Sequence, residues 1–260
     1  MSTDIRKLHK FAIYLADEAR NISLYYFKKK IDVKSKKIGS FDPVTIADIN
    51  IQKKLHKIIE KYYPSHSMLG EEESIIKNNP YEWCIDPIDG TRSFIQGVPL
   101  WGTLISLSKN KKVILGVADI PGLNERYVGY GKISYKIIKG KKSLLKVKNY
   151  LSLREATLNT TSPFTYANKK DQKKFEKVAK VAKATRLGGD CYSYCLLADG
   201  YIDIVIESGL KPYDIRAFIP IIKNAGGIMK SWEGNSVHNG GRILAATSKK
   251  LFIETQDLLI

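Results

Sequence analysis

Two aspartates lie three residues apart in the segment best suited to chemistry, WCIDPIDGTRSFIQG (residues 83–97). Asp86 and Asp89 follow an apolar stretch that predicts a strand, Pro87 fixes the turn, and Gly90 lets the backbone approach a ligand closely. Carboxylates this close repel each other unless a cation lies between them. Hard oxygen ligands of this kind suit Mg²⁺, which also binds phosphate oxygens.

The residues after this turn predict an anion site beside the metal. Gly90 and Thr91 begin a segment, Thr91 to Gln96, that we expect to be a short helix. Free N–H groups at the start of a helix attract anions, so a phosphate group would share one corner with the metal. Taken alone, the motif could instead be an ordinary Asp-rich turn.

Further carboxylates stand at the ends of other predicted elements. Glu71, Glu72 and Glu73 follow a short apolar strand, and their charge is costly near Asp86 unless metals neutralise it. Asp214 begins an apolar helix. Taken separately, the glutamates could form an acidic surface loop and Asp214 could be a helix cap. Together they extend the predicted Mg²⁺ site.

Other catalytic signatures are missing from the sequence. There is no GxSxG, HExxH or P-loop motif, and GYGK (129–132) is too short to cradle phosphates. Cys84, Cys191 and Cys195 form no CxxC pair, and with four scattered histidines they complete no zinc site. We expect them to be buried thiols.

Apolar spacing predicts the elements that must position these residues. In the first half it predicts a long amphipathic helix over 4–29 that ends in lysines, a mobile loop over 34–43 and a second helix that stops at Pro64. Short apolar runs then predict the strands 67–69, 82–85, 101–108, 113–119 and 125–130.

The second half alternates strands and helices. The predicted strands are 157–160, 202–207 and 242–247, and the predicted helices are 172–184, 191–199, 214–225 and 249–259. We therefore divide the chain into an N-terminal α+β section (1–150) with the metal motifs and a C-terminal section (151–260) that completes the site.

Composition indicates an ordinary globular protein with a strongly basic surface. The chain has 260 residues, 43% of them hydrophobic, and a formal net charge of +17. It has no long apolar stretch and no signal-like N-terminus, so we expect a cytoplasmic protein without a membrane partner. Its lysines are dispersed in short groups, which favours a solvated basic face over a nucleic-acid groove.

The motifs GEEE (70–73), DPIDGT (86–91) and PYD…AGG (212–227) resemble those of the inositol monophosphatase superfamily, which is magnesium-dependent and lithium-sensitive. The resemblance implies a layered αβαβα sandwich of the inositol monophosphatase / fructose-1,6-bisphosphatase type, and a homodimer. It also implies that Glu71, Asp86 and the Ile88 carbonyl bind one metal, that Asp86, Asp89 and Asp214 bind a second, and that a third lies near Glu71. By the same resemblance, Asp48 beside the Thr91 hydroxyl would activate the attacking water. The Gly90 and Thr91 amides would bind the phosphate.

Within this superfamily the sequence is most similar to the histidinol-phosphate phosphatases. The similarity lies in segments 91–107, 120–129, 188–207 and 210–227. The substrate of those enzymes carries an ammonium group and an imidazole, so its pocket should offer carboxylates, and Asp190 with Glu207 could supply them. Asp190 could also cap the helix that begins near Cys191.

Two other functions stay open at this stage. The first is an inositol-1-phosphate or broad sugar-phosphate phosphatase with the same fold, which acts on another small phosphorylated metabolite. The second is a regulatory protein that binds RNA or another polyanion through its basic surface and has lost catalysis. The complete set of Glu71, Asp86, Asp89, Thr91 and Asp214 argues against the second.

Overall fold

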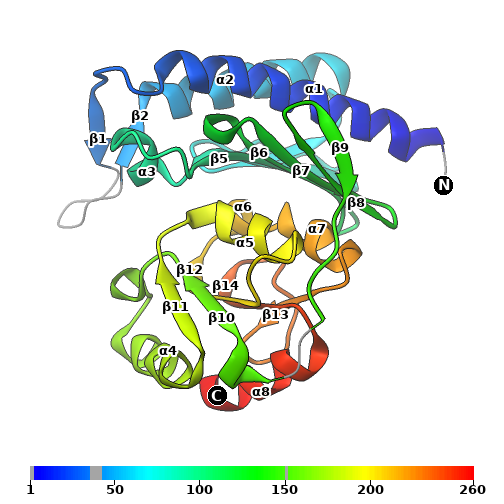
Figure 1. Ribbon diagram of the computed structural model, residues 1–260. Coiled ribbons are helices and arrows are strands. Elements are labelled where there is room, and N and C mark those ends of the chain that lie inside the picture. The colour runs from blue at the N-terminus through cyan, green and yellow to red at the C-terminus, as the bar shows by residue number, and fades with distance from the viewer. Residues whose placement is uncertain (1–2, 36–42, 150–151) are drawn as a thin grey trace.

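The computed structural model describes residues 3–35, 43–149 and 152–260, which fold into five alternating layers of helix and sheet (Figure 1). Helices α1 (Thr3–Tyr26) and α2 (Ile46–Tyr62) cover the outer face of a seven-stranded sheet. A middle layer of helices separates that sheet from a five-stranded one, whose far face is covered by two more helices. The predicted αβαβα arrangement is confirmed.

The seven strands of the first sheet lie side by side in chain order. They are β3 (Ser67–Gly70), β4 (Tyr81–Asp89), β5 (Gly102–Lys109), β6 (Lys112–Ile120), β7 (Glu125–Tyr130), β8 (Ile133–Ile138) and β9 (Lys141–Leu144). Only β3 and β4 run parallel among these neighbours; the others are antiparallel. Because β3 and β4 are parallel, the acidic motifs that end them lie at the same edge of the sheet.

The second sheet has the strand order β11-β10-β12-β14-β13. Its strands are β10 (Thr157–Thr160), β11 (Ala184–Leu187), β12 (Ile204–Leu210), β13 (Ile228–Ser231) and β14 (Gly241–Ala246). Strand β10 is parallel to both of its neighbours, whereas β14 is antiparallel to β12 and β13. The carboxyl ends of β10 and β12 therefore lie at one edge, as those of β3 and β4 do in the first sheet.

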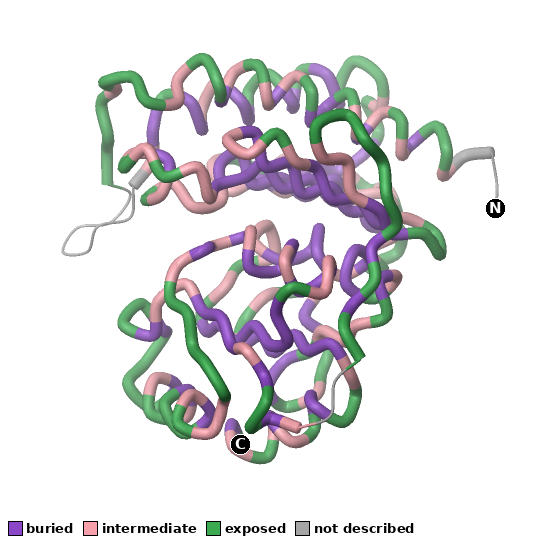
Figure 2. Tube along the Cα trace, in the orientation of Figure 1, coloured by how far each residue is buried: buried purple, intermediate pink, exposed green. Residues whose placement is uncertain are grey.

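Six further helices complete the layers. They are α3 (Thr91–Ile95), α4 (Lys169–Val181), α5 (Asp190–Ala198), α6 (Pro212–Ile215), α7 (Phe218–Asn224) and α8 (Lys249–Leu259), of which α3 directly follows β4. Helices α5, α6 and α7 form the middle layer, and α4 and α8 pack together on the far face. Buried residues follow both sheets and the inner helix faces (Figure 2). Within the described ranges, no helix is long and apolar enough to cross a membrane.

The single helix predicted over 214–225 is wrong, because the chain forms two helices there. Helix α6 ends at Ile215 and α7 begins at Phe218. Pro220 has no N–H to donate to the Arg216 carbonyl, and its ring obstructs a continuous helix at that point. The interruption lies at Arg216 and Ala217, just after Asp214.

Several boundaries also differ from the prediction where lysines are dense. Strands β8, β9 and β11 were not predicted, and β11 begins at Ala184, within the predicted helix 172–184. Both β9 and β11 are edge strands whose residues are all exposed, so they show no apolar alternation. The lysines expected to end the first helix lie beyond Tyr26. The predicted loop 34–43 begins and ends in paired strands, β1 (Val33–Ser35) and β2 (Pro43–Thr45), and its middle lies outside the described residues.

Candidate active site

A bulge at the end of β4 presents the two aspartates of the DPIDGT motif. In the pairing with β5, Asp86 lies opposite Leu104 and Asp89 opposite Gly102, so β4 has one extra residue between them. The Thr103 hydroxyl donates to the Pro87 carbonyl at 2.8 Å and anchors the bulge. Gly90 then adopts φ 81°, a left-handed conformation that a side chain would disfavour, and α3 begins.

Three carboxylates meet at this bulge. Oxygen atoms of Asp86, Asp89 and Asp214 lie within 4.8 Å of one another. Backbone N–H groups hold two of them, because Cys191 N donates to Asp89 at 2.7 Å and Lys211 N donates to Asp214 at 2.6 Å. Asp86 is 2% exposed, and its Oδ1 has no hydrogen-bond partner in the part of the chain that the structure describes.

A second acidic cluster lies beside the first. Oxygen atoms of Asp48, Glu71 and Glu72 also lie within 4.8 Å of one another. Asp48 belongs to the capping box of α2, where its Oδ2 accepts hydrogen bonds from Thr45 N (2.8 Å) and Thr45 Oγ1 (2.6 Å). Its Oδ1 is buried and makes no hydrogen bond within the described ranges. The structure thus groups Glu71 with Asp48 and Glu72.

Gln52 on α2 fixes the loop that carries Glu71, a role that was not predicted. Its Oε1 accepts a hydrogen bond from Glu72 N and its Nε2 donates to the Glu73 carbonyl, both at 2.9 Å. Gly70 permits the contact, since a Cβ there would lie 2.6 Å from the Gln52 side chain. The useful signal would have been its helical spacing, four residues after Asp48.

Burial and crowding raise the proton affinity of both clusters. Burial is the main cause of the raised pKa values of Asp86 and Asp89, and neighbouring carboxylates add to it. The pKa values of Asp48 and Asp214 rise to about 7, again mainly through burial and against opposing hydrogen bonds from Thr45 and Lys211 N–H. A divalent cation would remove this repulsion, and an all-oxygen donor set with a buried free oxygen on Asp86 fits Mg²⁺.

A cavity of about 280 Å³ opens directly over the carboxylates. Glu71, Asp89 and Asp214 line one side of it together with Gly90 and Thr91. The other side comes from the second sheet and α5, and includes the residues Thr161, Asp190, Tyr194 and Glu207. The cavity therefore brings the predicted metal, phosphate and specificity residues to one place.

Asp190 is held at the edge of this cavity. It occupies the first turn of α5 in a left-handed conformation (φ 41°), while Gly189 takes the capping position, so the predicted N-cap role is wrong. Ser93 Oγ donates to its Oδ2 at 2.8 Å. Burial raises the pKa of Asp190, and the Ser93 hydrogen bond and the Arg92 charge oppose that rise. Its other oxygen, Oδ1, accepts no hydrogen bond in the part of the chain that the structure describes.

Glu207 is more constrained than Asp190. It lies in β12, is 4% exposed and accepts hydrogen bonds from Thr161 N (2.5 Å) and Thr160 Oγ1 (3.3 Å) through its two oxygens. Burial raises its pKa to about 7. Both oxygens are thus already engaged, which suits a residue that shapes the cavity wall.

Two further observations concern hydroxyl groups. The Thr91 hydroxyl and Asp48, which were predicted to lie side by side, each bond to another group. The Thr91 hydroxyl donates to the Ile88 carbonyl at 2.9 Å, and Asp48 accepts a hydrogen bond from Thr45. Tyr194, which the sequence did not single out, stacks on Phe218 and lines the cavity. Its hydroxyl is buried and has no hydrogen-bond partner among the described residues.

The amino-acid sequence of this chain is similar to those of known phosphatases. The model of the inositol monophosphatase family matches residues 4–258. A chloroplastic bifunctional phosphatase, IMPL2 of Arabidopsis thaliana, is 41% identical over 223 residues, which are 85% of this chain and 63% of that protein. A histidinol-phosphatase of Chlorobaculum parvum is 31% identical over 242 residues, 92% of each chain.

The fold comparison gives the same grouping. The structure of an inositol monophosphatase from Zymomonas mobilis superposes with a TM-score of 0.88 at 33% sequence identity. It covers 100% of this chain and 99% of that chain. The similarity therefore includes both sheets and the cavity between them.

Proposed function

We propose, from the premise that the chain belongs to the inositol monophosphatase family of phosphatases, that it hydrolyses histidinol phosphate to histidinol and phosphate, a step of histidine biosynthesis. One observation carries this choice of substrate. The cavity that is lined by proposed metal ligands is also lined by Asp190, whose carboxylate accepts one hydrogen bond within the described residues, from Ser93. A cationic leaving group would use such a carboxylate, whereas a polyol would not need one.

The acidic clusters are the proposed Mg²⁺ ligands. Asp86, Asp89 and Asp214 would hold one ion, and Glu71, Asp86 and the Ile88 carbonyl another. The neighbourhood of Glu71 with Asp48 and Glu72 supports a third, looser ion. When bound, the ions would acidify the attacking water and neutralise charge on the phosphate group.

The chain's own residues would orient the phosphate and accept the proton. The Gly90 and Thr91 N–H groups lie at the start of α3 and at the cavity wall, where they would donate to phosphate oxygens. Asp48 would take the proton of the attacking water through its Oδ1, which is buried and makes no hydrogen bond within the described ranges. Thr91 would orient the water, held by its bond to Ile88.

The leaving group would contact the opposite wall. Asp190 would accept a hydrogen bond from the ammonium group of histidinol phosphate, and Glu207 would support the wall through Thr160 and Thr161. A charge-assisted hydrogen bond of this kind contributes about 1.5–3 kcal/mol, or roughly tenfold to a hundredfold in specificity. Arg92 lies close enough to Asp190 to weaken this preference, but its side chain is exposed.

Phosphate release from two substrates tests the proposal. The native enzyme with Mg²⁺ should have a higher kcat/KM for histidinol phosphate than for inositol 1-phosphate, and EDTA should abolish both activities. Asp190→Asn keeps the Ser93 hydrogen bond but removes the charge, so it should lower kcat/KM for histidinol phosphate by about tenfold to a hundredfold. Inositol 1-phosphate serves as the internal control and should be little affected. Equal losses on both substrates would refute the role of Asp190.

An inositol-phosphate phosphatase is the second candidate. The similarity to the Zymomonas mobilis inositol monophosphatase over the whole chain favours it. A native preference for inositol 1-phosphate in the same assay would select it and leave the metal site unchanged. Lithium inhibition, a homodimer and a cytoplasmic location remain predictions under either candidate.

A further inference from the structure

A larger cavity lies at the opposite end of the central strands from the metal carboxylates. Asp89 pairs with Gly102 at one end of β4 and β5, and Tyr81 pairs with Lys109 at the other, roughly 25 Å away at the usual rise per residue. The cavity has a volume of about 750 Å³ and shares no lining residue with the active site. We call it the basic cleft. It is walled by the β5–β6 hairpin, the β7–β8 turn, α7, the start of α1 and the segment 236–238.

The basic cleft gathers positive charge, and none of its described lining residues is acidic. Its lining includes five lysines: Lys109, Lys111, Lys112, Lys132 and Lys223. The Lys109 ammonium lies 4.9 Å from the centre of the Tyr81 ring. For the other four, no hydrogen bond or ion pair occurs within the parts of the chain that the structure covers.

Three arginines elsewhere in the chain are instead paired with carboxylates. They are Arg20, Arg126 and Arg216, and Arg20, for example, pairs with Asp119 at 2.7 Å. A concave surface with one sign of charge focuses its electrostatic potential into the cavity. The basic cleft is therefore suited to an anion that neutralises several lysines together.

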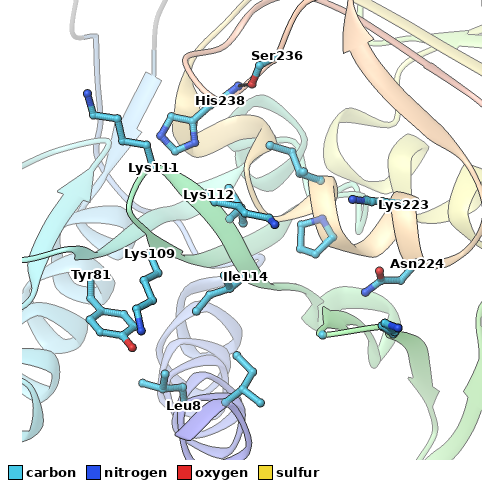
Figure 3. A pocket seen from close by; sticks show the side chains of 16 residues that line it. Leu8, Tyr81, Lys109, Lys111, Lys112, Ile114, Lys223, Asn224, Ser236 and His238 are labelled. Atoms are coloured by element: carbon cyan, nitrogen blue, oxygen red, sulfur yellow. Dashed lines mark hydrogen bonds between the residues drawn. The ribbon is translucent and has the colours of Figure 1, made fainter. Parts of the chain in front are cut away.

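Apolar side chains lie at one end of the cleft, next to Lys109 (Figure 3). Lys112 and Lys223 extend toward each other across its centre, and Lys111 lies beside His238. Leu8 and Ile114 lie at the other end, near Tyr81. A ligand that filled the cleft would thus place anionic groups among the lysines and an apolar or ring-shaped part against these side chains.

Size and charge narrow the class of ligand. Cavities of roughly 300–1,000 Å³ hold drug-sized ligands, so a lone orthophosphate would leave most of this one empty. Each phosphate carries roughly one to two negative charges at neutral pH, so a diphosphate or triphosphate matches the set of unpaired lysines. We propose that the basic cleft binds a nucleoside diphosphate or triphosphate, with its phosphates on Lys111, Lys112 and Lys223 and its base against Ile114. This inference does not depend on the proposed phosphatase substrate.

Equilibrium binding of ATP to the full chain, measured by calorimetry in EDTA at low salt, tests the proposal. EDTA keeps divalent metal away from the acidic clusters, which then repel phosphate. The triple variant Lys111→Ala/Lys112→Ala/Lys223→Ala should bind ATP about tenfold more weakly or worse, because three ammonium groups are lost. Its melting temperature and Mg²⁺-dependent phosphatase activity should stay close to native.

A matched triple variant separates a built site from net charge alone. Lys173, Lys177 and Lys180 are exposed on α4, so changing all three to alanine removes the same charge from another surface. This control should bind ATP as the native chain does. Equal weakening in both triple variants would overturn the proposal, as would inorganic triphosphate that binds as tightly as ATP. Tighter, lysine-dependent binding of single-stranded RNA would also overturn it, and would identify the cleft as part of a nucleic-acid surface.

Discussion

The active-site cavity and the basic cleft each gather charges of one sign, but they hold those charges in opposite ways. In the acidic clusters at the cavity, Asp48, Asp89 and Asp214 accept hydrogen bonds from backbone N–H groups 2.6–2.8 Å away. In the cleft, Lys111, Lys112 and Lys223 are exposed at the ends of long side chains. The carboxylates have fixed positions, and the lysines do not.

This difference between fixed carboxylates and mobile lysines determines how each region responds to substitution. Metal-assisted chemistry requires ligands held within about 0.5 Å of their working positions, so each carboxylate is individually indispensable. Attraction of an anion by several lysines depends on their summed field, so the loss of any one is partly compensated by the others. Single substitutions should therefore be severe in the cavity and graded in the cleft.

Substitution of Asp86 should have the largest effect. Asp86→Asn keeps the size of the side chain but removes the charge from the most buried of the three clustered aspartates. Several kcal/mol of transition-state stabilisation would be lost, so kcat/KM should fall by about a thousandfold or more. The rate of phosphate release at saturating Mg²⁺ measures this fall in kcat/KM.

A buried aspartate outside the cavity provides the control. Asp203 is 4% exposed and accepts hydrogen bonds from Thr157 N and Oγ1 at the second sheet. Asp203→Asn should lower the melting temperature but leave the activity of the folded enzyme near the native value. If Asp86→Asn kept more than about a tenth of the native activity, the carboxylates would not be the metal ligands.

Substitution of Gln52 should have an intermediate effect, because Gln52 holds the Glu71 loop in place but is not itself a proposed ligand. Gln52→Ala removes both hydrogen bonds to the loop without touching a proposed ligand. Groups that position ligands typically contribute tenfold to a hundredfold in metal affinity, so the Mg²⁺ concentration for half-maximal activity should rise by about that factor. Activity at saturating Mg²⁺ should largely recover.

Gln256 gives the matched control for this prediction. Its Nε2 donates to the Trp232 carbonyl at 2.6 Å, far from the acidic clusters. Gln256→Ala should leave the Mg²⁺ requirement unchanged. If Gln52→Ala instead lost activity that no Mg²⁺ concentration restored, Gln52 would have a role beyond positioning the loop.

The same contrast explains how much the sequence could predict. The Asp86–Gly90 turn, Glu71 and Asp214 are local motifs, each beside a recognisable apolar element, and the layered fold was implied by the family resemblance that these motifs carry. Gln52 and Tyr194 could not be predicted, because their roles depend on contacts that form only when distant segments meet, such as Gln52 with Glu73. Strands β9 and β11 were missed because exposed edge strands lack an apolar pattern.

The basic cleft was hidden for a related reason. Its lysines come from the hairpin at 109–112, the turn at 132 and α7 at 223, so in the sequence they look like dispersed surface charge. Charge patterning along a chain detects runs, and folding here assembles a cluster from separate single residues and pairs.

The smallest expected effect is on the pH dependence of stability without metal. Folding raises the pKa of Asp48 and Asp214 from 3.8 to about 7, and raises those of Asp86 and Asp89 well above 3.8. Between these values the folded state binds more protons than the unfolded state. The stabilisation from these groups is fully present below the unfolded pKa and is lost as pH rises through the folded pKa, so stability should fall with rising pH.

Histidines act in the opposite direction at lower pH. Burial lowers the pKa values of His9, His56 and His238 below 6.5, so they favour folding as pH rises toward 6.5 and contribute no further change above it. The decline caused by the acidic clusters should therefore be clearest between pH 6.5 and about 8. In EDTA the melting temperature should fall by a few degrees over this range, since roughly 1 kcal/mol shifts it by about 2–4 °C in a chain of this size.

Two experiments test whether the acidic clusters cause this fall of the melting temperature with pH: addition of Mg²⁺ and a substitution. Bound Mg²⁺ keeps the carboxylates ionised, so it should flatten most of the decline and leave the part due to Glu207, whose pKa is also about 7. Asp48→Asn should reduce the slope in EDTA, whereas Lys111→Ala should leave it unchanged, because that exposed side chain lies in the basic cleft. A melting temperature that stays constant from pH 6.5 to 8 in EDTA would contradict the crowded acidic clusters and remove the contrast between cavity and cleft.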